Sequence, residues 1–260
     1  MQRGHWDLFA VGYQQGHDAG HQFWNIHDPG ARRYKSEWHQ THGDPLLQVY
    51  EKIDQGIGEI ISTAGAEADA VIVTGLSMIE KRSCNSILDE LLWKLENLMY
   101  PGAGVSAKSP RQERRFFSVS HNAISGAIRL NLKDRESSGV VPRENYDQVL
   151  DELEERFQAI INPASGKSIV DMFIRTHTNY PGAKVDHLPD VFLVWDRSAS
   201  LTRVSSPWFE EIAVRSKNIL DFRTGDHESK ATVHSTFRLS QENTIPVESL
   251  AGQLETYLLH

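Results

Sequence analysis

The segment Trp6-Asp-Leu-Phe-Ala-Val-Gly-Tyr13 is an apolar run of strand length, and residues 14–30 follow it with many Gly, His, Asp and Asn residues. Such a run predicts a buried strand, and the polar, glycine-containing stretch predicts a loop with at most one short helical turn. In parallel sheets, functional side chains gather just after the carboxyl ends of strands. The loop after Tyr13 is therefore the first place where we expect chemistry.

The next elements continue an alternation of helices and strands. Residues 46–61 carry apolar side chains at helical spacing, and Asp44 followed by Pro45 is a typical helix start. Residues 70–74 read as a short buried strand and residues 87–98 as a second amphipathic helix. This order is that of α/β folds, so we predict a mostly parallel sheet flanked by helices.

The second part of the chain predicts further strands and one long helix. Residues 100–115 contain Pro, Gly and basic residues and are expected to be an exposed loop. The later elements are predicted strands at 126–132, 169–174 and 191–195, a helix at 144–161 and a turn at 162–166. We treat residues 1–260 as one domain with two parts, 1–100 and 116–240.

The composition restricts the class of protein. Of 260 residues, 39% are hydrophobic and 24% charged, as in ordinary globular proteins. No apolar run approaches the roughly 18 residues of a membrane span, and the first residues lack a signal-peptide pattern. A net charge of −8 argues against nucleic acid as the main partner. With Cys84 as its single cysteine, the chain is expected to be cytoplasmic, without a membrane partner.

Two histidines lie in the segment after the first predicted strand. His17 and His21 are four residues apart, and imidazoles so placed can share one metal ion. Gly20 allows the backbone to pass close to such an ion. The alternative is a pair of incidental histidines.

Five segments, taken in order along the chain, carry a resemblance to a known family. They are His17-Asp-Ala-Gly-His21 with its surroundings up to Pro29, Val49–Asp54 with Gly58, Gly126–Pro142, Pro189–Trp195 and Arg223-Thr-Gly-Asp-His227. Together they resemble the type I phosphodiesterase/nucleotide pyrophosphatase branch of the alkaline phosphatase superfamily. The resemblance covers the C-terminal half of that fold and implies a partial alkaline-phosphatase-like domain.

The resemblance implies a set of site residues. His17, His21 and His227 would hold one divalent metal ion, zinc or manganese, and leave one coordination position open. If the match to the family motif shifts by one residue, Asp18 takes the place of His17. It also implies a phosphoester small molecule as substrate, with Arg129 or His27 in contact with its phosphate. Considered as a residue within an apolar strand, Arg129 is equally compatible with a structural ion pair, because a buried guanidinium requires an anionic partner.

The family's second metal site has no counterpart in the matched segments. Gly75 and Leu76 occupy the positions of its Asp-His pair, and neither side chain can bind a metal. The family's nucleophile is expected in a half missing upstream of residue 1, so we expect a truncated relative with poor two-metal hydrolysis. The uncovered sheet edge predicts self-association, or an N-terminal partner chain that completes the fold.

Three hypotheses of function remain. The first is a phosphoester hydrolase that acts as a phosphodiesterase or nucleotide pyrophosphatase. The second is a non-catalytic relative that binds a metal or a protein partner. The third is an α/β domain whose histidines are incidental, which metal analysis separates from the other two.

Overall fold

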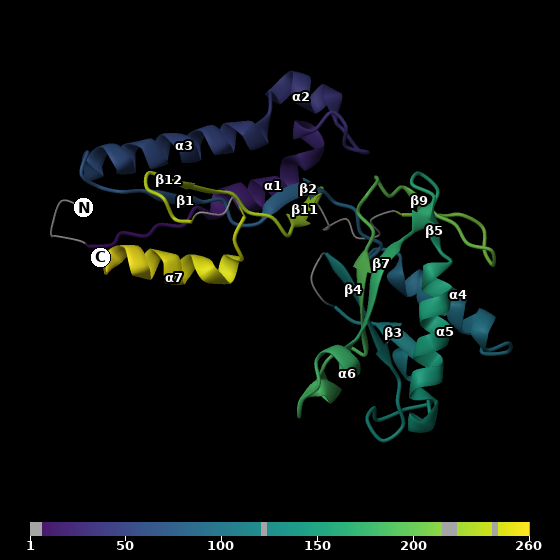
Figure 1. The fold of residues 1–260 in the computed structure, drawn as a ribbon. Helices are drawn as coiled ribbons and strands as arrows, with labels where there is room; N and C mark the ends of the chain where they lie inside the picture. The colour runs from purple at the N-terminus through teal and green to yellow at the C-terminus, as the bar shows by residue number, and fades with distance from the viewer. Residues whose placement is uncertain (1–6, 121–123, 215–222, 241–243, 260) are drawn as a thin grey trace.

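The computed structural model describes residues 7–120, 124–214, 223–240 and 244–259, which form two lobes (Figure 1). The helical lobe contains the first and last parts of the chain: α1 (Gln14–His27), α2 (Ser36–His42), α3 (Pro45–Ala64), β1 (Val71–Val73), β2 (Ser77–Glu80), β11 (Gly225–Glu228), β12 (Val233–Ser235) and α7 (Val247–Leu258). The sheet lobe lies between them in sequence: α4 (Leu88–Met99), β3 (Phe116–Ser118), β4 (Ser125–Leu130), α5 (Tyr146–Gln158), β5 (Ile161–Asn162), β6 (Lys167–Ser168), β7 (Val170–Arg175), α6 (Thr176–Asn179), β8 (Val191–Trp195), β9 (Arg203–Val204) and β10 (Ile212–Ala213). The two parts expected at 1–100 and 116–240 do not coincide with these lobes.

The sheet lobe holds the main hydrophobic core. Its four-stranded sheet has the order β3-β4-β8-β7, with each neighbouring pair antiparallel. Along β8 the side chains of Val191, Leu193 and Trp195 are buried and alternate with less buried ones, as a strand with one core-facing side requires. Helix α4 packs against β3, helix α5 against β7, and the two helices touch each other. The buried apolar residues that form one continuous cluster lie between Cys84 and Val214.

The helical lobe buries fewer apolar side chains than the sheet lobe. Helix α3 begins where Asp44 caps it, since the Asp44 carboxylate accepts a hydrogen bond from the backbone N–H of Leu47 at 3.0 Å. Although α3 is 20 residues long, Leu46 is its only buried residue. Most of the apolar face of α3 is therefore only partly covered by α1, its main neighbour.

The predicted parallel sheet is wrong: the named strand pairs are antiparallel, and the supported class is mixed α/β. In the helical lobe β1 pairs with β12 and β2 pairs with β11. Consecutive strands of the first 80 residues therefore never become sheet neighbours, and their partners come from residues 225–235. The alternation of strands and helices along the sequence predicts a parallel sheet only where consecutive strands share one sheet.

The structure also corrects the predicted start of the chain. Trp6 lies outside the described residues, and residues 7–13 form no strand, with Leu8 and Val11 exposed. The stretch predicted as a loop is helix α1 instead. Its glycines do not break the helix, because Gly16 packs against Tyr50 and Ile53 of α3 and a larger residue would find little space there.

Several predicted elements are confirmed. The helices predicted at 46–61, 87–98 and 144–161 are α3, α4 and α5, and the strands predicted at 126–132, 169–174 and 191–195 are β4, β7 and β8. Residues 162–166 form the turn between β5 and β6. Across the described part of the chain, no helix has both the length and the apolar character needed to cross a bilayer.

A buried ion pair ties β8 to the turn after β4. Both terminal nitrogens of Arg135 donate to the Asp190 carboxylate at 2.7 Å. The same carboxylate accepts from the backbone N–H of Leu130 at 2.7 Å and from the Tyr146 hydroxyl at 3.1 Å. Burial first, and then the Asp190 charge, raises the pKa of Tyr146. The Asp190 carboxylate is thus the shared acceptor of this network, and Arg135 has a further ion pair with Glu136 at 3.0 Å.

We expect Asp190→Ala to lower the free energy of unfolding by ~3–5 kcal/mol, because it leaves the buried Arg135 guanidinium without its main partner. Urea denaturation measures this change. The matched control is Asp171→Ala on the exposed side of β7, which should change stability by less than about 0.5 kcal/mol. Equal effects of the two substitutions would contradict the assigned role of Asp190.

Candidate metal centre

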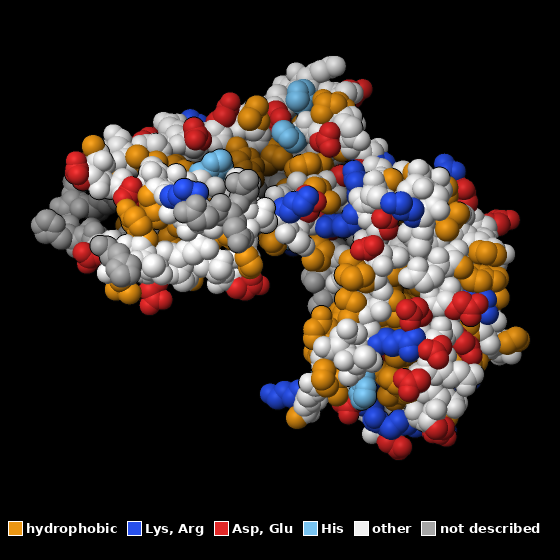
Figure 2. Space-filling model, in the orientation of Figure 1, with side chains coloured by type: hydrophobic (Ala, Val, Ile, Leu, Met, Phe, Trp, Pro, Cys, Tyr) orange, Lys and Arg blue, Asp and Glu red, His pale blue; other side chains and the backbone are white. Residues whose placement is uncertain are grey.

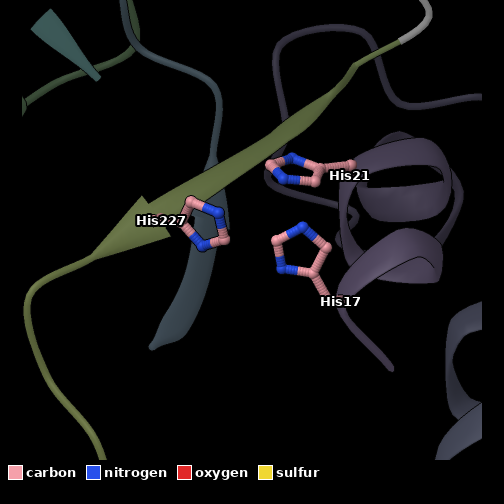
Figure 3. A group of neighbouring side chains, drawn as sticks. All are labelled: His17, His21 and His227. Carbon is pink, nitrogen blue, oxygen red and sulfur yellow. The ribbon is translucent and has the colours of Figure 1, made fainter. Parts of the chain in front are cut away.

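Three histidines from two distant segments meet in the helical lobe (Figure 3). His17 and His21 lie one turn apart on α1, and His227 faces them from β11. The ring centroids are separated by 4.7 Å for His17–His21 and by 4.8 Å for each of the other two pairs. One ring nitrogen of each residue lies within 4.8 Å of the other two, so the cluster can hold a metal ion.

The spacing fits a metal after a small adjustment. Ligands about 2.0–2.1 Å from a tetrahedral zinc ion lie roughly 3.3 Å from one another, so the nitrogens must approach one another slightly. His17 is exposed and free to rotate toward the others, whereas His21 is 5% exposed. The open side at His17 would leave a coordination position accessible to a ligand.

A backbone hydrogen bond fixes the orientation of His21. Its Nδ1 lies 2.9 Å from the carbonyl oxygen of Gly225. A carbonyl can only accept, so Nδ1 carries the proton and Nε2 has the free lone pair that a metal requires. The same strand end is held by the backbone N–H of Thr224, which donates to the His21 carbonyl at 2.6 Å.

His227 is held through its backbone and keeps its ring available. Its N–H donates to a carboxylate oxygen of Asp226 at 2.9 Å, and Arg197 donates to its carbonyl oxygen. The ring Nδ1 is buried and has no hydrogen-bond partner among the described residues. Burial, followed by the neighbouring His21 and His17, lowers the pKa of His227. The neutral imidazole that binds metals is therefore favoured.

Two glycines bring α1 close enough to the strands for the cluster to form. A Cβ at Gly225 would lie 2.2 Å from the carbonyl oxygen of Gly20. Only a shift of the backbone could relieve such a clash, so this position requires glycine. A Cβ at Gly20 would in turn lie 2.9 Å from the Met78 side chain. Met78 is the direct partner of His227 in the β2–β11 pair. The helix and the strand thus touch at the level of the histidines.

Asp18, the alternative to His17 as a ligand, does not join the cluster. It is exposed, and its carboxylate lies 3.5 Å from the side-chain amide of Gln14 on the outer face of α1. Because α1 is a helix, residues 17 and 21 share a face and residue 18 points about 100° away. The helix therefore selects His17.

His27 lies at the end of α1 beside a second feature, an open cavity of about 350 Å³. Its Nδ1 is 2.7 Å from the Asp44 carboxylate, and its ring stands edge-on to Trp24. The cavity is lined mainly by apolar side chains, including Leu76 and Met78. His27 thus lies beside a space next to Met78, the partner of His227.

Arg129, the other candidate for phosphate contact, has a structural partner instead. It pairs with Glu136 at 2.6 Å and donates to the carbonyl oxygens of Leu188 at 2.7 Å and Asp186 at 2.9 Å. These partners belong to the sheet lobe, and none belongs to the histidine cluster. Of the two interpretations offered by the sequence, the structure shows the ion pair.

The loop between β1 and β2 carries no second metal site. Gly75 adopts a left-handed conformation with φ of 66°, and Leu76 is 56% exposed. Within the described residues, the three histidines form the one group of three or more potential ligands close enough to share a metal.

Sequence reasoning missed the support behind His227. Asp226 is fully buried, and its carboxylate lies 3.4 Å from Arg197, which also contacts the carbonyl of His227. The acidic residue directly before a candidate ligand was the available signal. Arg197 lies 30 positions away along the chain from His227 and had no such signal.

Comparisons of this chain with protein-family models, with curated proteins and with solved structures found no match.

We expect Gly225→Ala to disrupt the metal centre, because its new methyl group would displace α1 from β11. Metal binding should weaken by at least about tenfold, and the midpoint of thermal unfolding should fall. The matched control is Gly58→Ala in α3, where the new methyl group has no neighbour within 4 Å. It should leave metal binding unchanged and stabilise the helix by ~0.5–1 kcal/mol. Calorimetric titration with zinc and thermal melts measure both, and unaltered metal binding in Gly225→Ala would refute this account.

Proposed function

We propose that this protein binds one divalent metal ion through His17, His21 and His227 and that a phosphoester is the ligand of the open coordination position. The observation that carries the proposal is the convergence of three imidazoles from α1 and β11, one of them oriented by the Gly225 carbonyl. The sequence resemblance to metal-dependent phosphodiesterases and nucleotide pyrophosphatases supplies the substrate class. We infer hydrolysis of a phosphoester as the reaction.

The donor set favours zinc over manganese. Imidazole nitrogens suit zinc, whereas manganese prefers carboxylate, carbonyl and water oxygens. Asp18 is turned away, and Asp226 is engaged with the His227 backbone and near Arg197. The cluster therefore presents nitrogen ligands alone.

The surrounding residues suit a hydrolytic role. When bound, such an ion supplies Lewis acidity, which polarises a phosphoryl oxygen and lowers the pKa of water. The Asp44 carboxylate accepts a hydrogen bond from Nδ1 of the partly exposed His27 ring. Nε2 of His27 is then the nitrogen that can accept a proton. The apolar wall at Trp24 and Leu76 suits the organic part of an ester. Of the two candidates for substrate contact, Arg129 and His27, we therefore retain His27.

A second candidate function is metal-dependent binding without turnover. It is favoured by the loop at Gly75 and Leu76, where the family's second metal ligands have no counterpart. Several exposed apolar residues of the helical lobe also suit a protein partner, whether a second copy or another chain. They are Leu8, Phe9, Val11, Leu47, Tyr50, Ile61, Val73 and Leu76.

Elemental analysis of the chelator-rinsed, zinc-reloaded protein tests the metal site. We expect about one zinc ion per chain in the wild type and at least tenfold weaker binding in His17→Ala, because two imidazoles bind far more weakly than three. His42→Ala is the control, since this histidine is exposed at the end of α2 and its ring is tilted against that of Trp38. Zinc retained by His17→Ala, or absent from the wild type, would refute the site.

Hydrolysis of bis(p-nitrophenyl) phosphate distinguishes the two candidate functions. For a hydrolase we expect zinc-dependent turnover that His17→Ala abolishes and His27→Ala reduces roughly 10²-fold or more, the usual contribution of a general base. The His42→Ala variant should retain full activity. Stoichiometric zinc binding without turnover would exclude the hydrolase for this substrate and favour the binding function.

A further inference from the structure

A second, smaller cavity lies where the two lobes join. It has a volume of about 50 Å³ and takes its walls from four separate parts of the chain. Four of its lining residues are basic, and Figure 2 shows Lys and Arg side chains gathered along this junction. The basic residues are Arg32, Arg33, Lys81 and Arg223, and the other lining residues include Ser83, Ser86, Leu201 and Val214.

The one acidic lining residue, Glu80, offsets only part of this charge. Glu80 is 8% exposed, and its carboxylate accepts from the backbone N–H of Arg32 at 2.7 Å and from the Ser200 hydroxyl. Its ion-pair partner is Arg82 at 3.3 Å, which is not among the lining residues. The negative charge of Glu80 is therefore already matched.

Within the described residues, the guanidinium groups of Arg32, Arg33 and Arg223 form no ion pair with a carboxylate, although the Glu80 charge lies near that of Arg32. Arg32 uses one terminal nitrogen to donate to the carbonyl oxygens of Leu201 and of Val214, the latter at 3.2 Å. Burial and the neighbouring Arg33 lower the pKa of Arg32. Arg33 and Arg223 contact no acceptor in the part of the chain that the structure describes. The side chains of Arg33 and Arg223 thus bring positive charge to the cavity that no described carboxylate pairs with.

A buried hydroxyl among the lining residues points to the same conclusion. Ser83 is 6% exposed, and its Oγ is buried without any hydrogen-bond partner among the described residues. Buried polar groups are almost always paired in native proteins, so an unpaired hydroxyl beside a basic cavity suggests an acceptor that arrives from outside. An anion would accept from Ser83 and from the arginines at once.

We propose that this cavity binds a small oxyanion, a phosphate ion or the phosphate group of a larger molecule. A buried water needs roughly 10–15 Å³ of such volume, so the cavity accommodates a few oxygen atoms and not a nucleotide. Guanidinium groups and hydroxyls are the donors that phosphate oxygens prefer. The bound anion would link the helical lobe, through Arg33 and Arg223, to Ser83 at the start of the sheet lobe.

The anion site is separate from the metal centre, and it goes beyond the proposed function. Residues 224–226 connect the two sites, and four steps of an extended backbone, about 3.3 Å each, place Arg223 up to roughly 13 Å from His227. Thr224, between them, lines the cavity and donates to the His21 carbonyl. An anion in this cavity is therefore not the group held at the metal.

Calorimetric titration of metal-free protein tests the proposal, with inorganic phosphate in one arm and phenyl phosphate in the other. The His17→Ala variant serves as the background, so that binding at the metal centre cannot contribute. We expect saturable binding in the His17→Ala background and at least roughly tenfold weaker binding when Arg33→Ala and Arg223→Ala are added together. A single hydrogen bond to a charged group contributes about this factor to an affinity. Arg143→Ala, an exposed arginine of the sheet lobe, is the matched control and should bind normally.

Ser83→Ala supplies a test that loss of folding cannot imitate. Because the hydroxyl is unpaired in the free protein, its removal should leave the melting temperature without phosphate unchanged or higher, yet weaken phosphate binding. Binding of both ligands with this dependence supports capture of the free ion, and binding of phenyl phosphate alone supports a group on a larger molecule. Binding of neither ligand at about 10 mM, or binding unaffected by these variants, overturns the proposal.

Discussion

The contact between α1 and β11 is the constraint on which the rest of the helical lobe depends. Gly20 and Gly225 bring the two backbones together, and the His21 ring closes the contact by donating to the Gly225 carbonyl across 204 residues of sequence. This contact positions two ligands on the helix opposite one on the strand. It also aligns β11 with β2, so Met78 packs under Gly20 beside the histidines. One backbone approach therefore determines both the metal centre and the short sheet that supports it.

The sheet lobe helps to maintain this contact between α1 and β11, which are far apart in the sequence. The chain leaves the helical lobe after β2, forms the main core between Cys84 and Val214, and returns to the helical lobe at β11. The core fixes where the chain leaves and returns, which reduces the conformational entropy lost when β11 pairs with β2. Arg197, which follows β8 of the sheet lobe, contacts Asp226 and the carbonyl of His227. The ligand strand is thus supported from the larger core.

Local periodicity and long-range pairing differ in how well the sequence predicts them. Helices α3, α4 and α5 were predictable because their apolar spacing is read within each segment. Helix α1 was not, because its glycines indicate a loop until their packing partners are known. The antiparallel pairs of the helical lobe join residues more than 140 positions apart, which no local pattern encodes. The three histidines were predicted together from the resemblance, whereas the cavity at Ser83 combines four segments that share no motif.

The two proposed sites both include residues of one short segment, Arg223 and Thr224 at the cavity and His227 at the metal centre, and this arrangement has a thermodynamic consequence. The helical lobe buries little apolar surface, so ligands that bind only its folded form contribute a large share of its stability. A metal ion would hold α1 against β11, and an anion beside Arg223 would hold the start of the same strand against the sheet lobe. Each ligand orders part of what the other requires, so binding of one should favour binding of the other, and the coupling must be equal in both directions. The short β11 strand is the element through which that coupling would pass.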